Sequence, residues 1–426
     1  MDSKTLYNTI CKAPFSISTD TRTLQEGQCF FCLRGETFDG NTFAEAALEK
    51  GAQLVVVDNP AAVLSEKCML VENTLKALQE LAQIHRSHFS IPVIAIGGSN
   101  GKTTTKELVA AVLGTEKKVH VTKGNLNNEI GVPLTLLALQ PEAEIAIIEV
   151  GANHSGEHTK LMEIVSPTHI LVTNNGADHL EGFGSLAGVR AANKELFDWA
   201  RTHSAHAFVN KALPDLVADS AGSSRMLYPT APYKSTSHML ASLEYKGTPI
   251  HSNLFGSFNE ANILAALAIG EHFAISLENM QKAITTYQPT LHRSQIYKGE
   301  NYVAVLDYYN ANPTSMQLAL TDFIQSTPAG KRILILGDML ELGTAEQAAH
   351  EGVLSFIKTA ADPKDTIFCI GPRFKQYAPQ YPFHFFETAT KARPEFNIIE
   401  LAGTYLFAKG SRGIKVEEVI EEKILF

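Results

Sequence analysis

A glycine-rich turn that joins an apolar run to a helical pattern constrains the fold of this chain more than any other feature. The run at residues 93–96, Val-Ile-Ala-Ile, is short and entirely apolar, which is typical of a buried parallel strand. It leads into Gly97-Gly98-Ser99-Asn100-Gly101-Lys102-Thr103-Thr104-Thr105. Leu108 and Val112 then fall four residues apart, as on one face of a helix. A strand, a glycine turn and a helix in this order predict an α/β domain with a mostly parallel sheet.

The turn has the chemistry of a polyphosphate-binding loop. Glycines let backbone N–H groups face a phosphate, and the helix that follows presents its N-terminus to the same anion. Lys102 supplies a cation, and the Thr103 hydroxyl can ligate magnesium. The full G-x-x-x-x-G-K-[ST] pattern is not met, because Ile96 stands five residues before Gly101, so the loop has the shorter form G-x-x-G-K-T-T. The alternative is a glycine turn with an incidental lysine. The predicted ATP-binding residues of this loop are Gly98, Ser99, Asn100, Gly101, Lys102, Thr103 and Thr104.

Three successive segments each alternate predicted strands and helices, which predicts three α/β domains. They cover residues 1–88, 89–290 and 291–426, and Ser90-Ile91-Pro92 and Gln288-Pro289-Thr290 separate them. The apolar strand candidates are 29–33 and 54–57 in the first segment, 93–96, 145–150 and 170–173 in the second, and 303–306, 333–336 and 367–370 in the third.

Composition argues against several classes of protein. The 36 basic and 45 acidic side chains give a net charge of −9, so we expect no nucleic-acid partner. No uninterrupted apolar stretch reaches about 18 residues, and residues 1–15 lack the apolar core of a signal peptide, so we expect a cytoplasmic protein without a membrane span. The five cysteines, an odd number, favour thiols in a reducing compartment. Cys29 and Cys32 have a C-x-x-C spacing, but the two phenylalanines between them favour a buried strand over a redox or zinc site.

Polar residues stand at the points where the predicted strands of the second segment end. Glu149 follows the apolar run 145–148, and a carboxylate at the tip of a parallel strand can ligate magnesium or simply be solvated. His179 lies near a glycine turn and, taken alone, is an ordinary surface histidine. Asn259 and Asn262 lie one helical turn apart and could face a nucleotide, although Asn259 could also cap the helix. The turn-rich loop before residue 130 adds amide side chains that can donate and accept hydrogen bonds, namely Asn125, Asn127 and Asn128.

The loop form G-[ST]-N-G-K-T-T resembles that of the Mur ligases, the ATP-dependent enzymes that build the peptide of bacterial cell-wall precursors, and that of folylpolyglutamate synthase. Further strings are similar to those of the Mur ligases that add D-alanyl-D-alanine, and they keep the family's order from about residue 18 to residue 412. These strings are D-[ST]-R at 20–22, L-x-G-x-x-x-D-G at 33–40, G-N-x-N-N-x-I-G-x-P at 124–133, E-x-G-x-N at 149–153, A-x-H-L-E-x-F-G-S at 177–185, G-x-x-N-x-x-N at 256–262, D-x-Y-N-A-N-P-x-S-M at 307–316, L-G-D-M-L-E-L-G at 336–343 and K-G-S-R at 409–412.

The resemblance implies an N-terminal UDP-sugar-binding α/β domain, a central P-loop ATPase domain with a mostly parallel sheet, and a C-terminal Rossmann-like ligase domain. It implies a monomer that uses ATP and Mg²⁺ to join D-alanyl-D-alanine to UDP-N-acetylmuramoyl-tripeptide through an acyl phosphate. The implied catalytic residues are Lys102, Glu149 and His179, and the implied metal ligands are Thr103, Glu149 and His179. The implied ATP contacts outside the loop are Asn259, Asn262, Arg293 and Asp307. The implied substrate contacts are Thr21, Arg22, Asn125, Asn127, Asn128, Asn310, Asn312 and Ser411.

Two other functions stay open on the sequence alone. Folylpolyglutamate synthase shares the phosphate loop, but it lacks the D-x-Y-N-A-N-P string and needs no UDP-binding segment. A catalytically silent scaffold protein could also have this fold. For the ligase itself, the sequence leaves open whether the third residue of the tripeptide is lysine or diaminopimelate.

One position departs from the family pattern. Many relatives have an A-K-G-E string whose lysine forms a carbamate that ligates the second metal ion. Here Asn193 occupies the position of that lysine, and Lys194 follows one residue later. Because successive helical residues point about 100° apart, Lys194 cannot take over the same direction unless the helix shifts by one residue. We therefore expect Lys194 to be unmodified.

Overall fold

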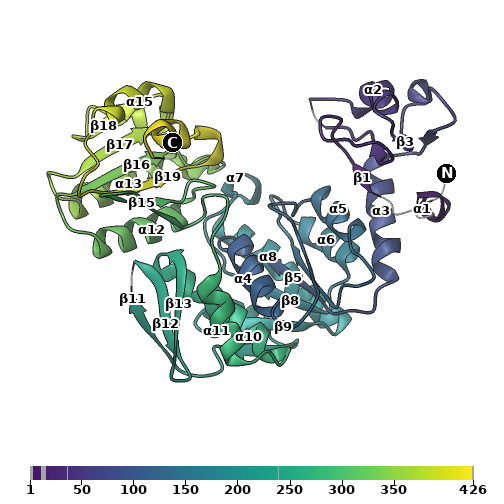
Figure 1. Cartoon of the computed structure of the whole chain (residues 1–426), viewed down its shortest axis with the longest axis horizontal. Coiled ribbons are helices and arrows are strands. Elements are labelled where there is room, and N and C mark those ends of the chain that lie inside the picture. Colours follow the sequence, from purple (N-terminus) through teal and green to yellow (C-terminus); the bar gives the residue numbers. More distant parts are fainter. Residues whose placement is uncertain (1–2, 11–15, 36, 238, 425–426) are drawn as a thin grey trace.

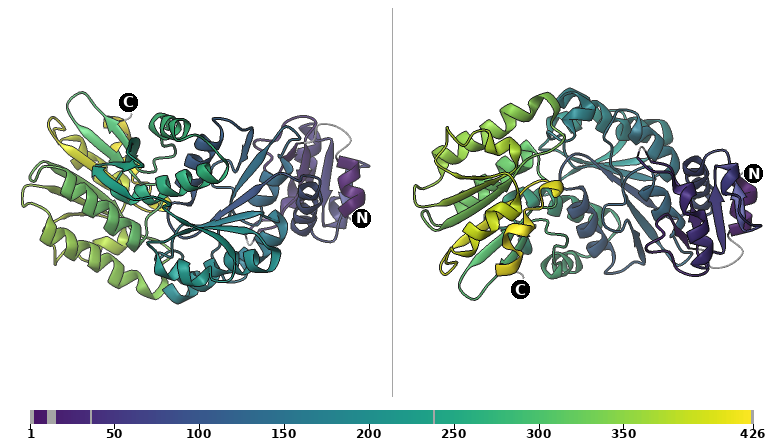
Figure 2. Two further views of the ribbon diagram at one scale, coloured as in Figure 1. Left: turned by 90° about the horizontal axis from the view of Figure 1, so that it is seen from below. Right: turned by 90° about the horizontal axis from the view of Figure 1, so that it is seen from above.

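The computed structural model describes residues 3–10, 16–35, 37–237 and 239–424. These residues form three sheets, and Figure 1 shows the N-terminal and C-terminal sheets on opposite sides of the central one. The two views of Figure 2 show the same order from below and above, with the chain curving from the N-terminal part to the C-terminal part. Within the described ranges, no helix combines the length and the apolar character that crossing a membrane requires.

The N-terminal part is a small parallel sheet. Its strands lie in the order β1-β2-β3-β4, and the predicted run at 29–33 supplies β2. Cys29 and Cys32 are buried in it, as the structural reading of the C-x-x-C spacing expects. Cys11 and Glu36 lie outside the described residues. The elements are α1 (Ser3–Ile10), β1 (Ile17–Ser18), β2 (Cys29–Phe31), α2 (Ala44–Glu49), β3 (Leu54–Val57), β4 (Cys68–Leu70) and α3 (Thr74–Ser87).

The central part is a six-stranded parallel sheet in the order β10-β9-β8-β5-β7-β6. Alternate residues of its strands face opposite sides, so Ala95 packs with the core under α5, α6 and α8, and Ile96 packs with the core under α4, α10 and α11. The strands are β5 (Val93–Gly97), β6 (Val119–Val121), β7 (Ile145–Glu149), β8 (His169–Val172), β9 (His206–Asn210) and β10 (Ser224–Tyr228). The helices are α4 (Lys102–Leu113), α5 (Gly131–Leu137), α6 (Glu157–Val165), α7 (Leu180–Phe183), α8 (Leu186–His203), α9 (Pro214–Asp219), α10 (Glu260–His272) and α11 (Leu277–Thr286).

The C-terminal part has the expected parallel core within a larger mixed sheet. Strands β15, β19, β16, β17 and β18 are parallel, whereas β14 pairs antiparallel with β15 and continues through one residue pair, Leu254 with Gln295, to the antiparallel strands β13, β12 and β11. The strands of this sheet are β11 (Tyr233–Ser237), β12 (Leu240–Tyr245), β13 (Thr248–Phe255), β14 (Gln295–Lys298), β15 (Val303–Leu306), β16 (Arg332–Gly337), β17 (Thr366–Ile370), β18 (His384–Phe386) and β19 (Tyr405–Lys409). Of these, β12 and β13 pack against α10 and α11 of the central part, so they belong to its core. The helices are α12 (Pro313–Ser326), α13 (Glu346–Ala360), α14 (Pro372–Lys375), α15 (Ala389–Asn397) and α16 (Glu417–Ile424).

Candidate functional site

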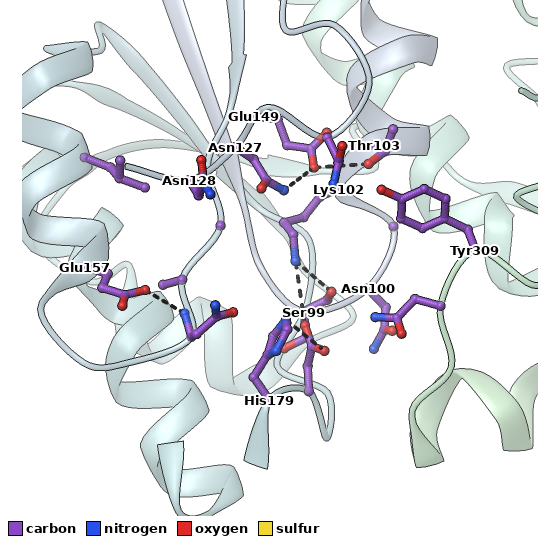
Figure 3. Close-up of a pocket in the computed structure, with 18 of the residues that line it drawn as sticks. Ser99, Asn100, Lys102, Thr103, Asn127, Asn128, Glu149, Glu157, His179 and Tyr309 are labelled. Carbon is purple, nitrogen blue, oxygen red and sulfur yellow. Dashed lines mark hydrogen bonds and ion pairs between the residues drawn. The ribbon is translucent and has the colours of Figure 1, made fainter. Parts of the chain in front are cut away.

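A cavity of about 910 Å³ lies where the three parts of the chain meet. It is bounded by the first residues of α3, by the phosphate loop and the loops after β6, β7 and β8, and by the segments around β15. Figure 3 shows Lys102, Glu149 and His179 directed into this space, with Tyr309 on its far side. The predicted site residues that line it are Ser99, Asn100, Gly101, Lys102, Thr103, Thr104, Asn125, Asn127, Asn128, Glu149, His179, Asn259, Asn262, Arg293, Asp307, Asn310 and Asn312.

The phosphate loop has the backbone that its glycines permit. Gly98 and Gly101 have φ of 114° and 82°, in the left-handed region that favours glycine. A Cβ at Gly98 would meet Thr173 Oγ1 at 2.3 Å, and one at Gly101 would meet Asn262 Oδ1 at 2.5 Å. Gly101 is the N-cap of α4 and gives it no side-chain cap, so the first amides of the helix can serve an anion. Lys102 Nζ donates to the carbonyl oxygens of Gly98, at 2.6 Å, and Ser99, at 3.0 Å.

Glu149 stands at the end of β7 beside the first turn of α4. Its Oε1 accepts hydrogen bonds from Thr103 Oγ1 at 3.1 Å and from Asn127 Nδ2 at 2.7 Å. Its Oε2 is buried and has no hydrogen-bond partner in the described structure, and Lys106 Nζ lies 3.4 Å from it. A buried carboxylate oxygen that accepts no hydrogen bond, next to a threonine hydroxyl, can ligate a divalent cation.

No group of three or more histidine, cysteine, aspartate or glutamate side chains in the described ranges is arranged to hold a metal ion. Thr103 and Glu149 nevertheless present hydroxyl and carboxylate oxygens side by side, and oxygens are the ligands that magnesium prefers.

His179 is held between two carboxylates. Its Nδ1 lies 2.5 Å from Glu341 Oε2, in the loop after β16, and its Nε2 lies 3.6 Å from Asp178 Oδ1. Burial alone would lower the pKa of His179, but the hydrogen bond to Glu341 and the charges of Asp178 and Glu341 raise it overall. The same hydrogen bond lowers the pKa of Glu341.

Asn259 and Asn262 line the cavity and are buried. Asn262 accepts from Thr105 Oγ1 at 3.0 Å and donates to Asn259 Oδ1 at 2.7 Å, and Asn259 donates in turn to the Phe255 carbonyl at 2.8 Å. Asn259 therefore makes no side-chain cap on α10, and the capping alternative is wrong. The two amides tie the start of α10 to the phosphate-loop helix.

Two predicted ATP contacts reach the cavity from the hinge before β14 and from the end of β15. The guanidinium of Arg293 lies 3.6 Å from the centre of the Tyr309 ring, and its Nε has no hydrogen-bond partner in the described structure. Asp307 accepts from the backbone of Ser294 at 2.8 Å and pairs with the buried Lys409 at 2.7 Å. Asp307 thus holds the hinge beside Arg293.

The asparagines of the 307–316 string have different positions. Asn312 caps α12 through Ser315, and its Nδ2 donates to Asn100 Oδ1 at 2.7 Å. Asn310 lines the cavity, and its Oδ1 accepts from the next amide, that of Ala311.

Four predicted residues are not part of the cavity lining. Gly98 belongs to the phosphate loop but does not line the cavity, and its carbonyl accepts a hydrogen bond from Lys102 Nζ. Thr21 and Arg22 lie near the surface of the N-terminal sheet, where Arg22 pairs with Asp20 at 2.7 Å. Ser411 is buried and joins two loops, accepting from Leu340 N and donating to the Ala311 carbonyl.

The side chains of Asn193 and Lys194, successive residues of α8, point in different directions. Asn193 is buried, and its Nδ2 donates to Asn175 Oδ1 at 2.9 Å in the loop after β8. Lys194 is directed elsewhere and pairs with Asp198 at 2.7 Å. The structure contains no one-residue shift that would restore the lysine.

Sequence reasoning missed Tyr309 and Lys409, which line the cavity and stand inside strings that were recognised. It also missed two residues that contact lining residues: Lys106, which lies 3.4 Å from Glu149, and Glu341, which pairs with His179. The polar character of Lys106 on an otherwise buried helix was a usable signal, whereas Glu341 stands in the 336–343 string and only the fold brings it to His179.

Three family models match the chain in succession. The model described as "Mur ligase family, catalytic domain" matches residues 16–86, "Mur ligase middle domain" matches 96–270, and "Mur ligase, glutamate ligase domain" matches 292–393. The expected family resemblance is therefore confirmed.

Individual relatives are similar over almost the whole chain. UDP-N-acetylmuramoyl-tripeptide–D-alanyl-D-alanine ligase of Bacillus subtilis is 33% identical over 96% of this chain and 93% of its own length. The enzyme with the same name in Escherichia coli is 35% identical, over 95% of this chain and 92% of its own. A crystal structure of MurF from Acinetobacter baumannii is 28% identical, with a TM-score of 0.84 over 96% of this chain and 93% of that one.

Proposed function

The chain belongs to the Mur ligase family, and from that premise we propose that it joins D-alanyl-D-alanine to UDP-N-acetylmuramoyl-tripeptide with ATP, in the synthesis of peptidoglycan precursors. The observation that carries the proposal is that the phosphate loop and the D-x-Y-N-A-N-P segment line one cavity although they are about 200 residues apart in sequence. A ligase needs this arrangement, because the activated carboxylate and the attacking amine must meet beside the ATP phosphates.

A carboxylate becomes reactive toward an amine only after it gains a better leaving group. In the proposed reaction the terminal carboxylate of the tripeptide attacks the γ-phosphorus of ATP, and ADP leaves. The amine of D-alanyl-D-alanine then attacks the acyl carbon, and phosphate departs from the tetrahedral intermediate. Catalysis of such transfers is mainly positioning and neutralisation of charge.

The residues of the cavity can both position the reacting groups and neutralise their charge. Lys102 and the first amides of α4 bind the transferred phosphates, and the Asp178 carboxylate 3.7 Å from Lys102 Nζ helps to hold that side chain in place. Arg293, stacked on Tyr309, reaches the same space from the other side. Contacts between the central and C-terminal parts exclude water from the acyl phosphate, which would otherwise hydrolyse.

Magnesium would be held by Thr103 and Glu149, with His179 at a second position, and when bound it would neutralise charge on the phosphate oxygens. We propose, from the family resemblance, that the protein acts as a monomer. The N-terminal sheet is the proposed binding site for the UDP portion. Since ATP and the nucleotide-linked precursor are made in the cytoplasm, that is the proposed compartment.

Phosphate release distinguishes the candidate functions. The purified chain is incubated with ATP, Mg²⁺ and each acceptor pair in turn. The proposal predicts release that needs both UDP-N-acetylmuramoyl-tripeptide and D-alanyl-D-alanine, and comparing the lysine and diaminopimelate tripeptides identifies the third residue. Release that needs a folate and L-glutamate would instead support a folylpolyglutamate synthase, and no release with any pair would support a silent scaffold.

A further inference from the structure

The loop between β16 and α13 contacts the central part directly behind His179. Glu341 has φ of 63° in this loop, and its carbonyl accepts a hydrogen bond from Glu181 N at 3.1 Å. Gly343, with φ of 52°, packs against the same segment, because a Cβ there would lie 3.2 Å from Glu181 Cα. The backbone of the C-terminal part therefore fixes the place from which Glu341 reaches His179, which lines the cavity.

The Glu341 carboxylate meets only one nitrogen of the His179 ring. Oε2 lies 2.5 Å from Nδ1, which is a short charge-assisted hydrogen bond. The Nε2 atom points the other way, and its nearest carboxylate, Asp178, is 3.6 Å distant, too far for a hydrogen bond. His179 itself is the N-cap residue of α7 and has a left-handed backbone with φ of 46°.

We propose that Glu341 is a positioning residue that keeps the proton of the neutral His179 ring on Nδ1 and so leaves Nε2 as the free ligand atom in the cavity. A histidine that binds a metal ion commonly donates its other N–H to a carboxylate, which fixes the tautomer and the ring orientation. The part of the proposal that concerns a metal ion rests on the proposed function. The tautomer itself depends only on the described contacts.

The pair joins the central and C-terminal parts, both of which line the cavity. His179 belongs to the central part and Glu341 to the C-terminal part, 162 residues later. The C-terminal part thus supplies the group that orients a ligand in the site. Glu341 is 59% exposed, and exposed ion pairs contribute little to stability, so its effect is on orientation rather than on folding.

The test reads the tautomer in the chain without substrates. Selective ¹⁵N labelling of histidine, with His179→Ala to identify the signal, reports which ring nitrogen carries the proton at a pH where the ring is neutral. The expected result is Nδ1–H in the unmodified protein. Glu341→Gln should keep this tautomer, because its amide oxygen can still accept from Nδ1–H. Glu341→Ala should shift the ring to the Nε2–H form that free histidine prefers. Glu351→Gln, an exposed carboxylate on α13, is the matched control and should change nothing.

A second measurement links the tautomer to the site. The apparent KM for Mg²⁺ should rise several-fold in Glu341→Ala and stay near the original value in Glu341→Gln, with equal unfolding temperatures. The inference would be overturned if the His179 tautomer were unchanged in Glu341→Ala. It would also be overturned if the apparent KM for Mg²⁺ rose equally in Glu341→Ala and Glu341→Gln. Failure of the proposed function would look different, because the unmodified chain would then form no ligation product while the tautomer result remained.

Discussion

The side-chain amide of Asn312 donates a 2.7 Å hydrogen bond to Oδ1 of Asn100, although 212 residues separate them in sequence. Asn100 belongs to the phosphate loop, and Asn312 begins α12 of the C-terminal part. A neighbouring bond, from Ala177 N in the loop after β8 to Thr314 Oγ1 at 3.1 Å, also joins the central part to the first turn of α12. The first turn of α12 is therefore tied directly to the loop that we expect to bind ATP, so nucleotide binding and the approach of the C-terminal part should be coupled.

Asn312 both caps α12 and donates a hydrogen bond to Asn100, and the variant Asn312→Ser tests these two roles separately. Serine is a good helix N-cap, so α12 should stay capped, but its side chain is too short to reach Asn100. We expect a rise of roughly 3–10-fold in the KM for ATP, as for the loss of one hydrogen bond of about 1 kcal/mol, with little change in unfolding temperature. Asn312→Ala should raise KM similarly and also destabilise the protein by about 1 kcal/mol. Equal KM values in all three proteins would show that the bond has no role in ATP binding.

Lys102→Ala tests the nucleotide site. The lysine stabilises charge on the transferred phosphate and contributes nothing to a hydrophobic core, so kcat for phosphate release should fall by about 100-fold or more while the fold is retained. Circular dichroism and the unfolding temperature check the fold. Lys123→Ala, at an exposed lysine in the loop after β6, is the matched control. Normal turnover by Lys102→Ala would show that the ATPase assignment is wrong.

The structural features that could be predicted from the sequence each depend on a short stretch of the chain. The glycine positions of the phosphate loop, the lysine and threonine that follow them, and the carboxylate at the tip of β7 occur within short strings whose geometry follows from the strand and helix around them. The apolar strands of the parallel sheets were recognisable for the same reason.

The parts that the sequence did not predict depend on tertiary contacts. Glu341 meets His179, and Lys409 meets Asp307, only after distant segments pack together. Strand β11, Tyr-Lys-Ser-Thr-Ser, is polar and mostly exposed, so a search for apolar runs could not find it. Because this strand was not predicted, no pattern in the sequence indicated that the C-terminal sheet contains antiparallel as well as parallel strands.

Lys194 should carry no carbamate. It pairs with Asp198 on the face of α8 away from Asn193, and the neutral amide of Asn193 cannot form a carbamate. Activity should therefore be the same within about 2-fold in carbon-dioxide-depleted and bicarbonate-supplemented buffer, and Lys194→Ala should retain it. A ¹³C-bicarbonate NMR signal of a carbamate that disappears in Lys194→Ala, or activity that bicarbonate restores, would contradict this prediction.

Three histidines at the edge of the central sheet opposite the phosphate loop should make stability depend on pH. Burial, with smaller effects of His272 and His206, lowers the pKa of His169 to about 4, and its Nε2 lies 3.2 Å from that of His272. The folded protein keeps the ring neutral, whereas the unfolded chain binds a proton below about pH 6.5. The contribution of the neutral His169 ring to the free energy of unfolding is therefore fully present above pH 6.5. This contribution is lost as the pH drops toward 4, and the loss is on the order of 2 kcal/mol.

His169→Gln should reduce this loss. The difference in free energy of unfolding between pH 7 and pH 5, from urea denaturation, should be smaller in the variant than in the unmodified protein. His251→Gln, at an exposed histidine, should leave the difference unchanged. An equal pH dependence in all three proteins would exclude His169 as its source.

The central claim is that the chain forms an amide bond to D-alanyl-D-alanine, and mass spectrometry of the reaction product tests it most directly. The chain is incubated with ATP, Mg²⁺, UDP-N-acetylmuramoyl-tripeptide and an equal mixture of D-alanyl-D-alanine, D-alanine and L-glutamate. We expect one new nucleotide-linked product, heavier by D-alanyl-D-alanine less one water, and one ADP for each product molecule. A product that contains D-alanine or L-glutamate, or hydrolysis of ATP without any product, would contradict it.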